Sequence, residues 1–160
     1  MTARRRAALA GAVAATTWAL LEPLDKRLFR YDYSDIAVLR KLLTRGPGWR
    51  AAGFALHAAN GAVFGLVFNE ARQLVDADAR RLAVAMALGE HVALFPLSWF
   101  VDRHHPARGT AGVPPLLNPR AFGQATVRHA TFGLVLGRLA TGGAQRAAGR
   151  RGTRPRRAAA

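Results

Sequence analysis

The stretch AAGFALHAANGAVFGLVF, residues 51–68, is apolar on every face of a helix and carries no charge when His57 is neutral. A helix needs about 20 residues, with 17 to 25 as the usual range, to cross the roughly 30 Å hydrocarbon core of a bilayer. The stretch therefore predicts a transmembrane helix. It also raises a question, because it places His57 and Asn60 among neighbours that offer their polar atoms no hydrogen bonds.

Three further segments have a similar length and composition. The first has Glu22 as its only charge, the second has Glu90, and the last carries Arg128 and Arg138. A soluble helix bundle would show a polar stripe on each helix, and the central segments show none. We therefore expect an all-α fold in the form of a four-helix transmembrane bundle, with spans at about 7–24, 51–68, 82–101 and 121–140.

Basic residues lie mainly outside the expected spans, which is typical of chains that cross a bilayer. The chain then divides into a basic N-terminus (1–6), a four-span membrane domain (7–140) and a basic, disordered C-terminal tail (141–160). The distribution of arginines favours cytoplasmic termini by a small margin. We expect the tail to contact anionic lipid rather than nucleic acid. The first segment also has features of a cleavable signal peptide, although further spans follow it.

The loop between the first two spans predicts a short amphipathic helix. Ser34 can cap this helix, and Gly46 and Pro47 end it. Arg40, Lys41 and Arg45 are expected to project away from an apolar face formed by Ile36, Leu39, Leu42 and Leu43. Such a helix would lie on the membrane surface or pack on the bundle. Elsewhere, Asp78 and Asn118 are the expected N-caps of the third and fourth spans.

Two nine-residue frames in the second and fourth spans match each other. HAANGAVFG (57–65) and HATFGLVLG (129–137) share five of nine residues at an offset of 72 positions. The match suggests two duplicated helical hairpins related by an approximate twofold axis along the membrane normal. Small residues at this spacing allow helix backbones to approach closely, and they place both histidines toward protein. The expected helix-packing residues are Gly53, Gly61, Gly65, Gly133 and Gly137.

Titratable or polar groups lie near the middle of three spans. A charged side chain at that depth costs about 2.5–3.5 kcal/mol on insertion scales, so it should be paired, neutralised or hydrated. We expect an ion pair between Glu90 and Arg128, with the neighbouring polar groups completing its hydrogen bonds. The expected midplane polar cluster is His57, Asn60, Glu90, His91, Arg128 and His129.

Three functional interpretations of this cluster remain open. It can be a polar lock in a structural or interaction component, which is the first interpretation. The second is a small proton-coupled transporter or channel subunit, which would act as a homodimer because four spans seldom enclose a pathway. The third is a haem-binding membrane protein that uses His57 and His129 as axial ligands. Apart from this haem hypothesis, we expect no cofactor and no metal.

Evidence for catalysis is missing from the sequence. It contains no cysteine, no phosphate-binding glycine loop, no Gly-x-Ser-x-Gly and no His-Glu-x-x-His, so no catalytic residue is assigned. Asp102, His104 and His105 are interpreted as part of a solvated loop. The layout of four short spans, a midspan His-x-x-x-Gly-x-x-x-Gly and a basic tail resembles that of small bacterial inner-membrane proteins of uncharacterised function. This resemblance covers about residues 7–140 and implies a location and a fold, but no activity.

Overall fold

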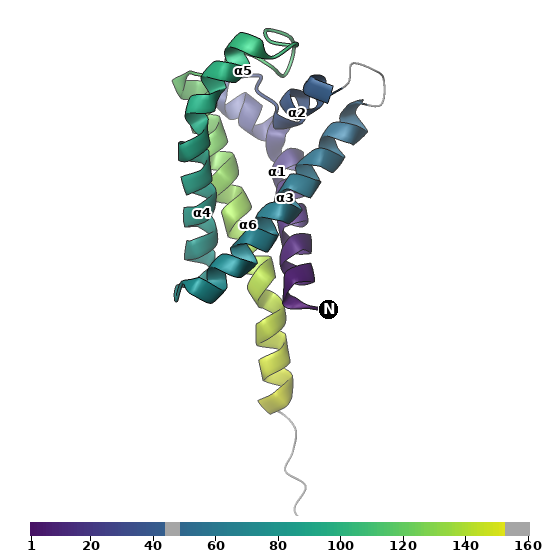
Figure 1. Ribbon diagram of the computed structural model, residues 1–160, viewed down its shortest axis with the longest axis vertical. Coiled ribbons are helices and arrows are strands. Elements are labelled where there is room, and N and C mark those ends of the chain that lie inside the picture. The colour runs from purple at the N-terminus through teal and green to yellow at the C-terminus, as the bar shows by residue number, and fades with distance from the viewer. Residues whose placement is uncertain (44–48, 153–160) are drawn as a thin grey trace, which may run out of the picture.

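The computed structural model describes residues 1–43 and 49–152, and every element in this part of the chain is helical (Figure 1). In chain order the elements are α1 (Ala3–Phe29), α2 (Asp35–Leu43), α3 (Trp49–Leu74), α4 (Ala79–Leu94), the 3-10 turn η1 (Phe95–Leu97), α5 (Ser98–His104) and α6 (Pro119–Gly152).

Three helical segments in the described part of the chain are long and apolar enough to cross a membrane. They are Ala3–Phe29, Ala51–Leu74 and Ala79–His104. In the most apolar stretch of each segment, no more than 33% of the residues are buried inside the protein. Most of the side chains in these stretches therefore face outward. Apolar surface of this extent needs lipid or another protein around it. Arg128 and Arg138 interrupt the apolar run of α6, which is not among the three.

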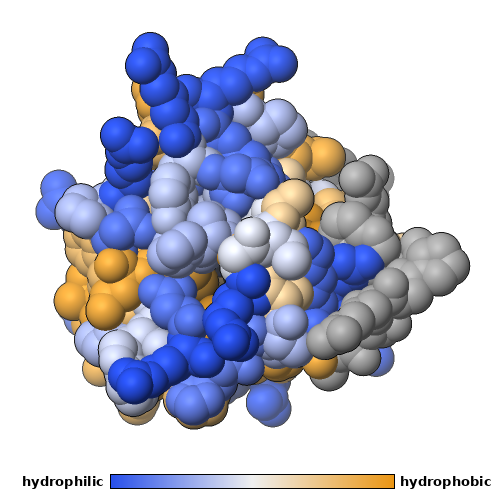
Figure 2. All heavy atoms as spheres, turned by 90° about the horizontal axis from the view of Figure 1, so that it is seen from above, coloured by the Kyte–Doolittle hydropathy of each residue, from blue (hydrophilic) through white to orange (hydrophobic). Residues whose placement is uncertain are grey.

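Helices α1 and α6 form the centre of the molecule, with α3 packed on α1 and α4 packed on α6 (Figure 1). The start of α1 and the C-terminal half of α6 lie at the same end of the bundle. The opposite end carries α2, α5 and the loop before α6. Figure 2 looks onto that end and shows hydrophilic residues over much of it, with apolar side chains at the rim.

Both expected N-caps are confirmed. The Asp78 carboxylate accepts hydrogen bonds from the backbone N–H groups of Arg80 and Arg81, at 3.1 and 3.0 Å. Asn118 Oδ1 accepts from the N–H groups of Arg120 and Ala121, at 3.0 and 3.1 Å. These bonds satisfy donors that have no partner within the first turn of a helix, and they fix where α4 and α6 begin.

Two helices differ in extent from the expected spans. The span expected at 82–101 lies within the candidate span Ala79–His104, but it is not one regular helix. Pro96 lacks an N–H group and its ring disfavours a continuous α-helix, so α4 ends at Leu94 and η1 and α5 follow. Helix α6 does not end near Ala140. It continues to Gly152, into the expected disordered tail at 141–160, of which residues 153–160 lie outside the described residues.

The short helix in the first loop forms as expected, but its buried face differs from the expected one. Ser34 Oγ accepts a hydrogen bond from Ala37 N–H at 3.2 Å and caps α2. Ala37 and Arg40 are buried, whereas Leu42 is 60% exposed. The Arg40 Cβ packs closely against Gly53 of α3. This close contact turns the Arg40 side of α2 inward.

Lys41 does not project freely into water as expected. Its ammonium group donates hydrogen bonds to Thr110 Oγ1 at 2.7 Å and to the Ala111 carbonyl at 2.5 Å. These bonds tie α2 to the loop that precedes α6. Arg45, which was also expected to project away from the helix, lies outside the described residues.

Two seams of small residues hold the helices together, and both use expected packing glycines. At the α1–α3 seam, a Cβ added to Gly61 would lie 2.5 Å from the Gly11 carbonyl oxygen, and one added to Gly65 would lie 2.1 Å from the Ala7 oxygen. The backbones therefore touch at a distance that no larger residue permits. Gly53 packs on α2 rather than on α1.

The α4–α6 seam uses the corresponding positions. A Cβ on Gly133 would lie 2.9 Å from the Ala83 oxygen, and one on Gly137 would lie 3.0 Å from the Ala79 oxygen. Ala79 and Ala83 follow Ala7 and Gly11 by 72 residues, the same offset as between the two glycine frames. Both seams therefore pair equivalent positions of the two halves.

We predict that Gly61→Val destabilises the protein by at least about 1–3 kcal/mol, because the added side chain would overlap the α1 backbone. The control is Gly89→Val on α4, where an added Cβ meets nothing within 4 Å. Thermal unfolding of both variants in detergent measures the effect. If Gly61→Val has the same melting temperature as Gly89→Val, the seam does not depend on contact between the two backbones.

Candidate functional site

Arg128 of α6 is buried between two carboxylates. Its Nε and one terminal nitrogen donate to Asp25 at 2.5 and 2.7 Å, and the other terminal nitrogen donates to Asp35 Oδ2 at 2.6 Å. A further bond goes to the Tyr33 carbonyl at 2.9 Å. This cluster, which we call the arginine lock, joins α6 to the end of α1 and to the start of α2.

The expected ion pair between Glu90 and Arg128 is wrong. Side chains on an α-helix point toward its N-terminus, and α6 runs antiparallel to α1. The long Arg128 side chain therefore extends toward the C-terminal end of α1, where Asp25 lies. Two carboxylates with charge-assisted hydrogen bonds stabilise the guanidinium there better than one carboxylate on α4 could.

Tyr33 and Gln124 complete the arginine lock. Gln124 Nε2 donates to Asp25 Oδ1 at 2.6 Å, and the Tyr33 ring lies 4.9 Å from the Arg128 guanidinium carbon. The Tyr33 hydroxyl donates to Asp35. Burial and the neighbouring Asp35 charge raise the pKa of Tyr33 well above its usual range. For Asp35, burial alone would raise the pKa, but Arg128 and the Tyr33 hydroxyl together hold it below its usual value.

Four residues of the expected midplane cluster line one cavity of about 200 Å³, which we call the central cavity. His57 and Asn60 come from α3, Glu90 from α4 and His129 from α6. Helices α3 and α4 make few contacts with each other, and the cavity lies in the space that they leave. Asp35 of α2 also lines it. The cluster was expected to fill its own hydrogen bonds, but in the structure it surrounds a space.

Three imidazoles and an indole form a continuous row of rings beside the central cavity. Trp18 contacts His57 and His129, with ring centroids 5.0 and 4.9 Å apart. His129 stacks on His91 at 4.8 Å. His91 Nε2 lies 3.0 Å from Thr126 Oγ1, and His129 Nδ1 lies 2.8 Å from the Ala125 carbonyl oxygen. His57 Nε2, by contrast, is buried without a hydrogen-bond partner.

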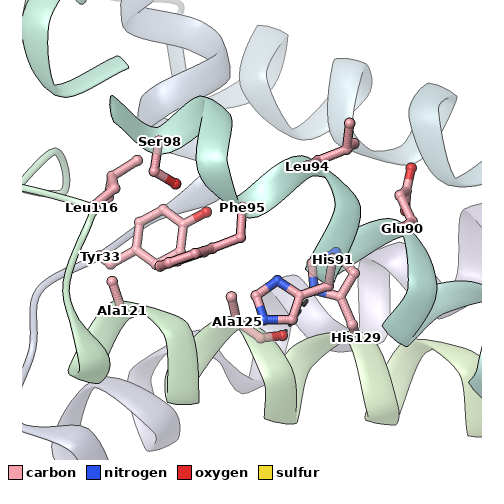
Figure 3. Close-up of a pocket in the computed structure, with 10 residues that line it drawn as sticks. All are labelled: Tyr33, Glu90, His91, Leu94, Phe95, Ser98, Leu116, Ala121, Ala125 and His129. Atoms are coloured by element: carbon pink, nitrogen blue, oxygen red, sulfur yellow. Dashed lines mark hydrogen bonds between the residues drawn. The ribbon is translucent and has the colours of Figure 1, made fainter. Parts of the chain in front are cut away.

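A second cavity of about 130 Å³, shown in Figure 3, shares lining residues with the central cavity. Glu90, Leu94 and His129 line both cavities. The second cavity extends past His91 to Ser98 and Leu116, near the end of the bundle that carries the loops. Figure 3 shows Glu90 pointing away from the stacked rings of His91 and His129. The two cavities together lead from the middle of the bundle toward one end.

The sequence located the residues around the cavity better than it located the partners of Arg128. Asp25, Asp35 and Trp18 were not among the expected site residues. One signal could have indicated Asp25, because it directly follows an apolar span that must run antiparallel to the helix of Arg128. Gln124 lies one helical turn before Arg128 and shares its face. Asp35 depends on how α2 folds back, which no local pattern specifies.

The VDRHHP segment is not simply a solvated loop. His105 is buried, and its Nε2 lies 2.9 Å from the Val38 carbonyl oxygen of α2. Asp102 accepts hydrogen bonds from the backbone N–H groups of Leu116 and Leu117 at 2.6 and 2.8 Å. His104 remains exposed. Asp102 and His105 therefore hold the loops together.

The haem hypothesis stays a prediction. The Trp18 indole contacts both proposed axial ligands, His57 and His129, so a porphyrin held between them would have to displace the indole. Within residues 1–43 and 49–152, no group of three or more His, Cys, Asp or Glu side chains is arranged to hold a metal ion.

Comparisons of the sequence with protein families and with curated proteins, and of the fold with solved structures, give no match. A functional assignment must therefore rest on the chemistry of the two cavities and the arginine lock.

We predict that Arg128→Leu destabilises the protein by about 3–5 kcal/mol, because it leaves Asp25 and Asp35 as buried charges without their cation. Arg138→Leu, on an exposed position of the same helix, should change stability by less than about 0.5 kcal/mol. Thermal unfolding in detergent compares the two. Equal melting temperatures for both variants would contradict the role of the arginine lock.

We also predict a loss of stability in acid that depends on Asp35. Its folded pKa is below its unfolded value of about 3.9. The ionised Asp35 therefore adds stability that is fully present above about pH 4 and is lost as the pH falls through the folded pKa. Melting temperatures between pH 3 and pH 7 should fall less steeply in Asp35→Asn than in the wild type. Asp76→Asn, in an exposed loop, should keep the wild-type profile.

Proposed function

We propose that this chain is a bacterial inner-membrane protein with four crossings, formed by α1, α3, α4 with α5, and α6. Both termini then lie on the cytoplasmic side. The shared position of the α1 start and the α6 C-terminal half at one end of the bundle supports an even number of crossings (Figure 1). The burial of Arg128 supports α6 as the fourth crossing, because its charge is compensated inside the protein while Val127, Leu134 and Leu139 face outward.

The same proposal includes an internal repeat. The two seams pair residues at a common offset of 72, with Gly61 on Gly11 in one half and Gly133 on Ala83 in the other. Equivalent positions make equivalent backbone contacts, which supports two hairpins of common origin. The imidazoles at His57 and His129 then face the same space from opposite halves.

Within this membrane protein, the central cavity binds a small polar solute, as part of a transporter or channel subunit. The observation that carries this proposal is that the buried polar residues form two distinct sets, one paired within the arginine lock and one lining the central cavity. Arg128 is fully paired in the arginine lock, while His57, Glu90 and His129 line the cavity. Ionisable residues inside a membrane protein that face a cavity are the usual components of solute and proton pathways.

The adjoining cavity supports passage as well as binding. It shares Glu90 and His129 with the central cavity and reaches Ser98 and Leu116 near the loops. A solute could therefore approach Glu90 from that end of the bundle. Proton coupling would use the Glu90 carboxylate, which is half-buried and lines both cavities together with His129. A homodimer would complete the remainder of the pathway.

A second candidate is a structural or interaction component. The hydrogen bonding of all three guanidinium nitrogens of Arg128 favours it, because such a network fixes helix register without any ligand. Under this interpretation Glu90 and the histidines contribute only to stability. The two candidates therefore differ in what a change at Glu90 should do.

We predict that Glu90→Gln lowers flux through the protein at least about tenfold, because the carboxylate that lines both cavities loses its charge and its proton. Proton flux into dye-loaded proteoliposomes under an imposed potential, and osmotic swelling with glycerol and urea, provide the measurements. The control is Glu70→Gln on α3, an exposed carboxylate that pairs with Arg4.

Flux in the wild type above that of empty liposomes, retained by Glu70→Gln and lost in Glu90→Gln, supports the solute pathway. A wild type that carries neither protons nor solutes, with Glu90→Gln altering only the melting temperature, favours the structural candidate instead.

A further inference from the structure

The charged side chains that line the two cavities are the carboxylates of Glu90 and Asp35, although the chain as a whole has a net charge of +15. Glu90 lines both cavities and Asp35 lines the central one, while no lysine or arginine is among the described residues of either lining. An anion would meet only carboxylates, neutral polar groups and apolar side chains there. The walls therefore favour a cation.

Glu90 is the carboxylate that such a cation would meet. Asp35 already has the Arg128 guanidinium at 2.6 Å and the Tyr33 hydroxyl as partners. Glu90 forms no ion pair within the part of the chain that the structure describes. A bound cation would stabilise the negative charge of Glu90, and it would not have to displace a basic side chain that already pairs with this carboxylate.

The apolar part of the central cavity consists largely of aromatic rings. Trp18, Phe64 and Phe132 all line it. Phe132 contacts the other two, with centroids 6.4 Å from Trp18 and 5.1 Å from Phe64. Faces of aromatic rings attract cations, and tryptophan does so most strongly. A small inorganic cation prefers a cage of about six to eight oxygen ligands, whereas this lining supplies the side-chain oxygens of Asp35, Asn60 and Glu90. The rings favour an organic cation with apolar substituents.

His57 adds a directional contact. His57 is 6% exposed and lines the central cavity. Its Nε2 has no partner. In a neutral imidazole whose other nitrogen carries the proton, this atom is an acceptor. A buried acceptor without a donor is costly, so a ligand that supplies an N–H group would remove that cost.

We propose that the central cavity binds a small organic ammonium ion that carries at least one N–H group. Glu90 pairs with its charge, His57 Nε2 accepts its hydrogen bond, and Trp18 with the two phenylalanines surrounds its apolar substituent. This inference rests on the proposed function of the cavity as a solute site, and it names the class of solute.

The experiment uses Trp18 as the reporter. Trp49→Phe and Trp99→Phe together leave Trp18 as the only tryptophan of the full chain. This parent protein is titrated in detergent with n-butylammonium chloride at constant ionic strength, and its fluorescence is followed. Neutral 1-butanol tests the need for charge, and tetramethylammonium tests the need for an N–H donor.

We expect saturable binding of n-butylammonium and weaker binding of both comparison ligands. Glu90→Gln should weaken n-butylammonium binding about ten- to hundredfold, which corresponds to the loss of one hydrogen bond to a charged group. His57→Phe should weaken n-butylammonium about tenfold and leave tetramethylammonium unchanged. Glu70→Gln is the control and should bind as the parent does.

The inference is overturned if the parent shows no saturable change with n-butylammonium, or if 1-butanol or tetramethylammonium binds as tightly. These comparisons need no variant in the cavity, so a variant that fails to fold does not affect them. If glycerol or proton flux depends on Glu90 while n-butylammonium does not bind, the proposed function stands and only the ligand class is wrong. If Glu90→Gln changes neither flux nor binding, both are wrong.

Discussion

The fold depends on how one guanidinium is accommodated inside an apolar bundle. Arg128 meets Asp25 and Asp35 at hydrogen-bonding distance, and these partners come from the end of α1 and the start of α2. Burying an arginine without partners would cost more than the apolar packing around it can offset. The arrangement of α1, α2 and α6 follows from this pairing. Because the three guanidinium nitrogens of Arg128 already have partners, the side chains of His57, Glu90 and His129 are not needed to pair with it and can line the central cavity.

The central cavity results from the way the two seams divide the molecule. Gly61 and Gly65 bring α3 onto α1, and Gly133 and Gly137 bring α4 onto α6, with backbones in contact. The close contacts between backbones therefore lie within each hairpin, at the small residues. Helices α3 and α4, which belong to different hairpins, make few contacts with each other. The space between them is lined by whatever the inner faces of all four helices carry. In this chain those faces carry imidazoles, a carboxylate and aromatic rings.

Sequence patterns predicted what depends on local chemistry or on repeated spacing. The caps at Asp78 and Asn118, the short α2 and the packing glycines of both frames were all predicted, because each follows from a motif a few residues long. The partners of Arg128 were not, since they depend on how an antiparallel helix and a folded loop meet in space. The central cavity could not be predicted either, because composition places polar groups at a depth but does not say whether they touch.

The interruption at Pro96 has a consequence for the surrounding lipid. Helix α4 alone has 16 residues and is about 24 Å long, so the segment Ala79–His104 reaches across a hydrocarbon core of about 30 Å only if α4, η1 and α5 cross it together. Pro96 leaves a backbone carbonyl of the preceding turn without its N–H partner. In a bilayer such a carbonyl needs a partner from a neighbouring helix, a side chain or a local 3-10 turn, and η1 is a turn of this kind. The side of the crossing at η1 is therefore better placed against protein than against acyl chains.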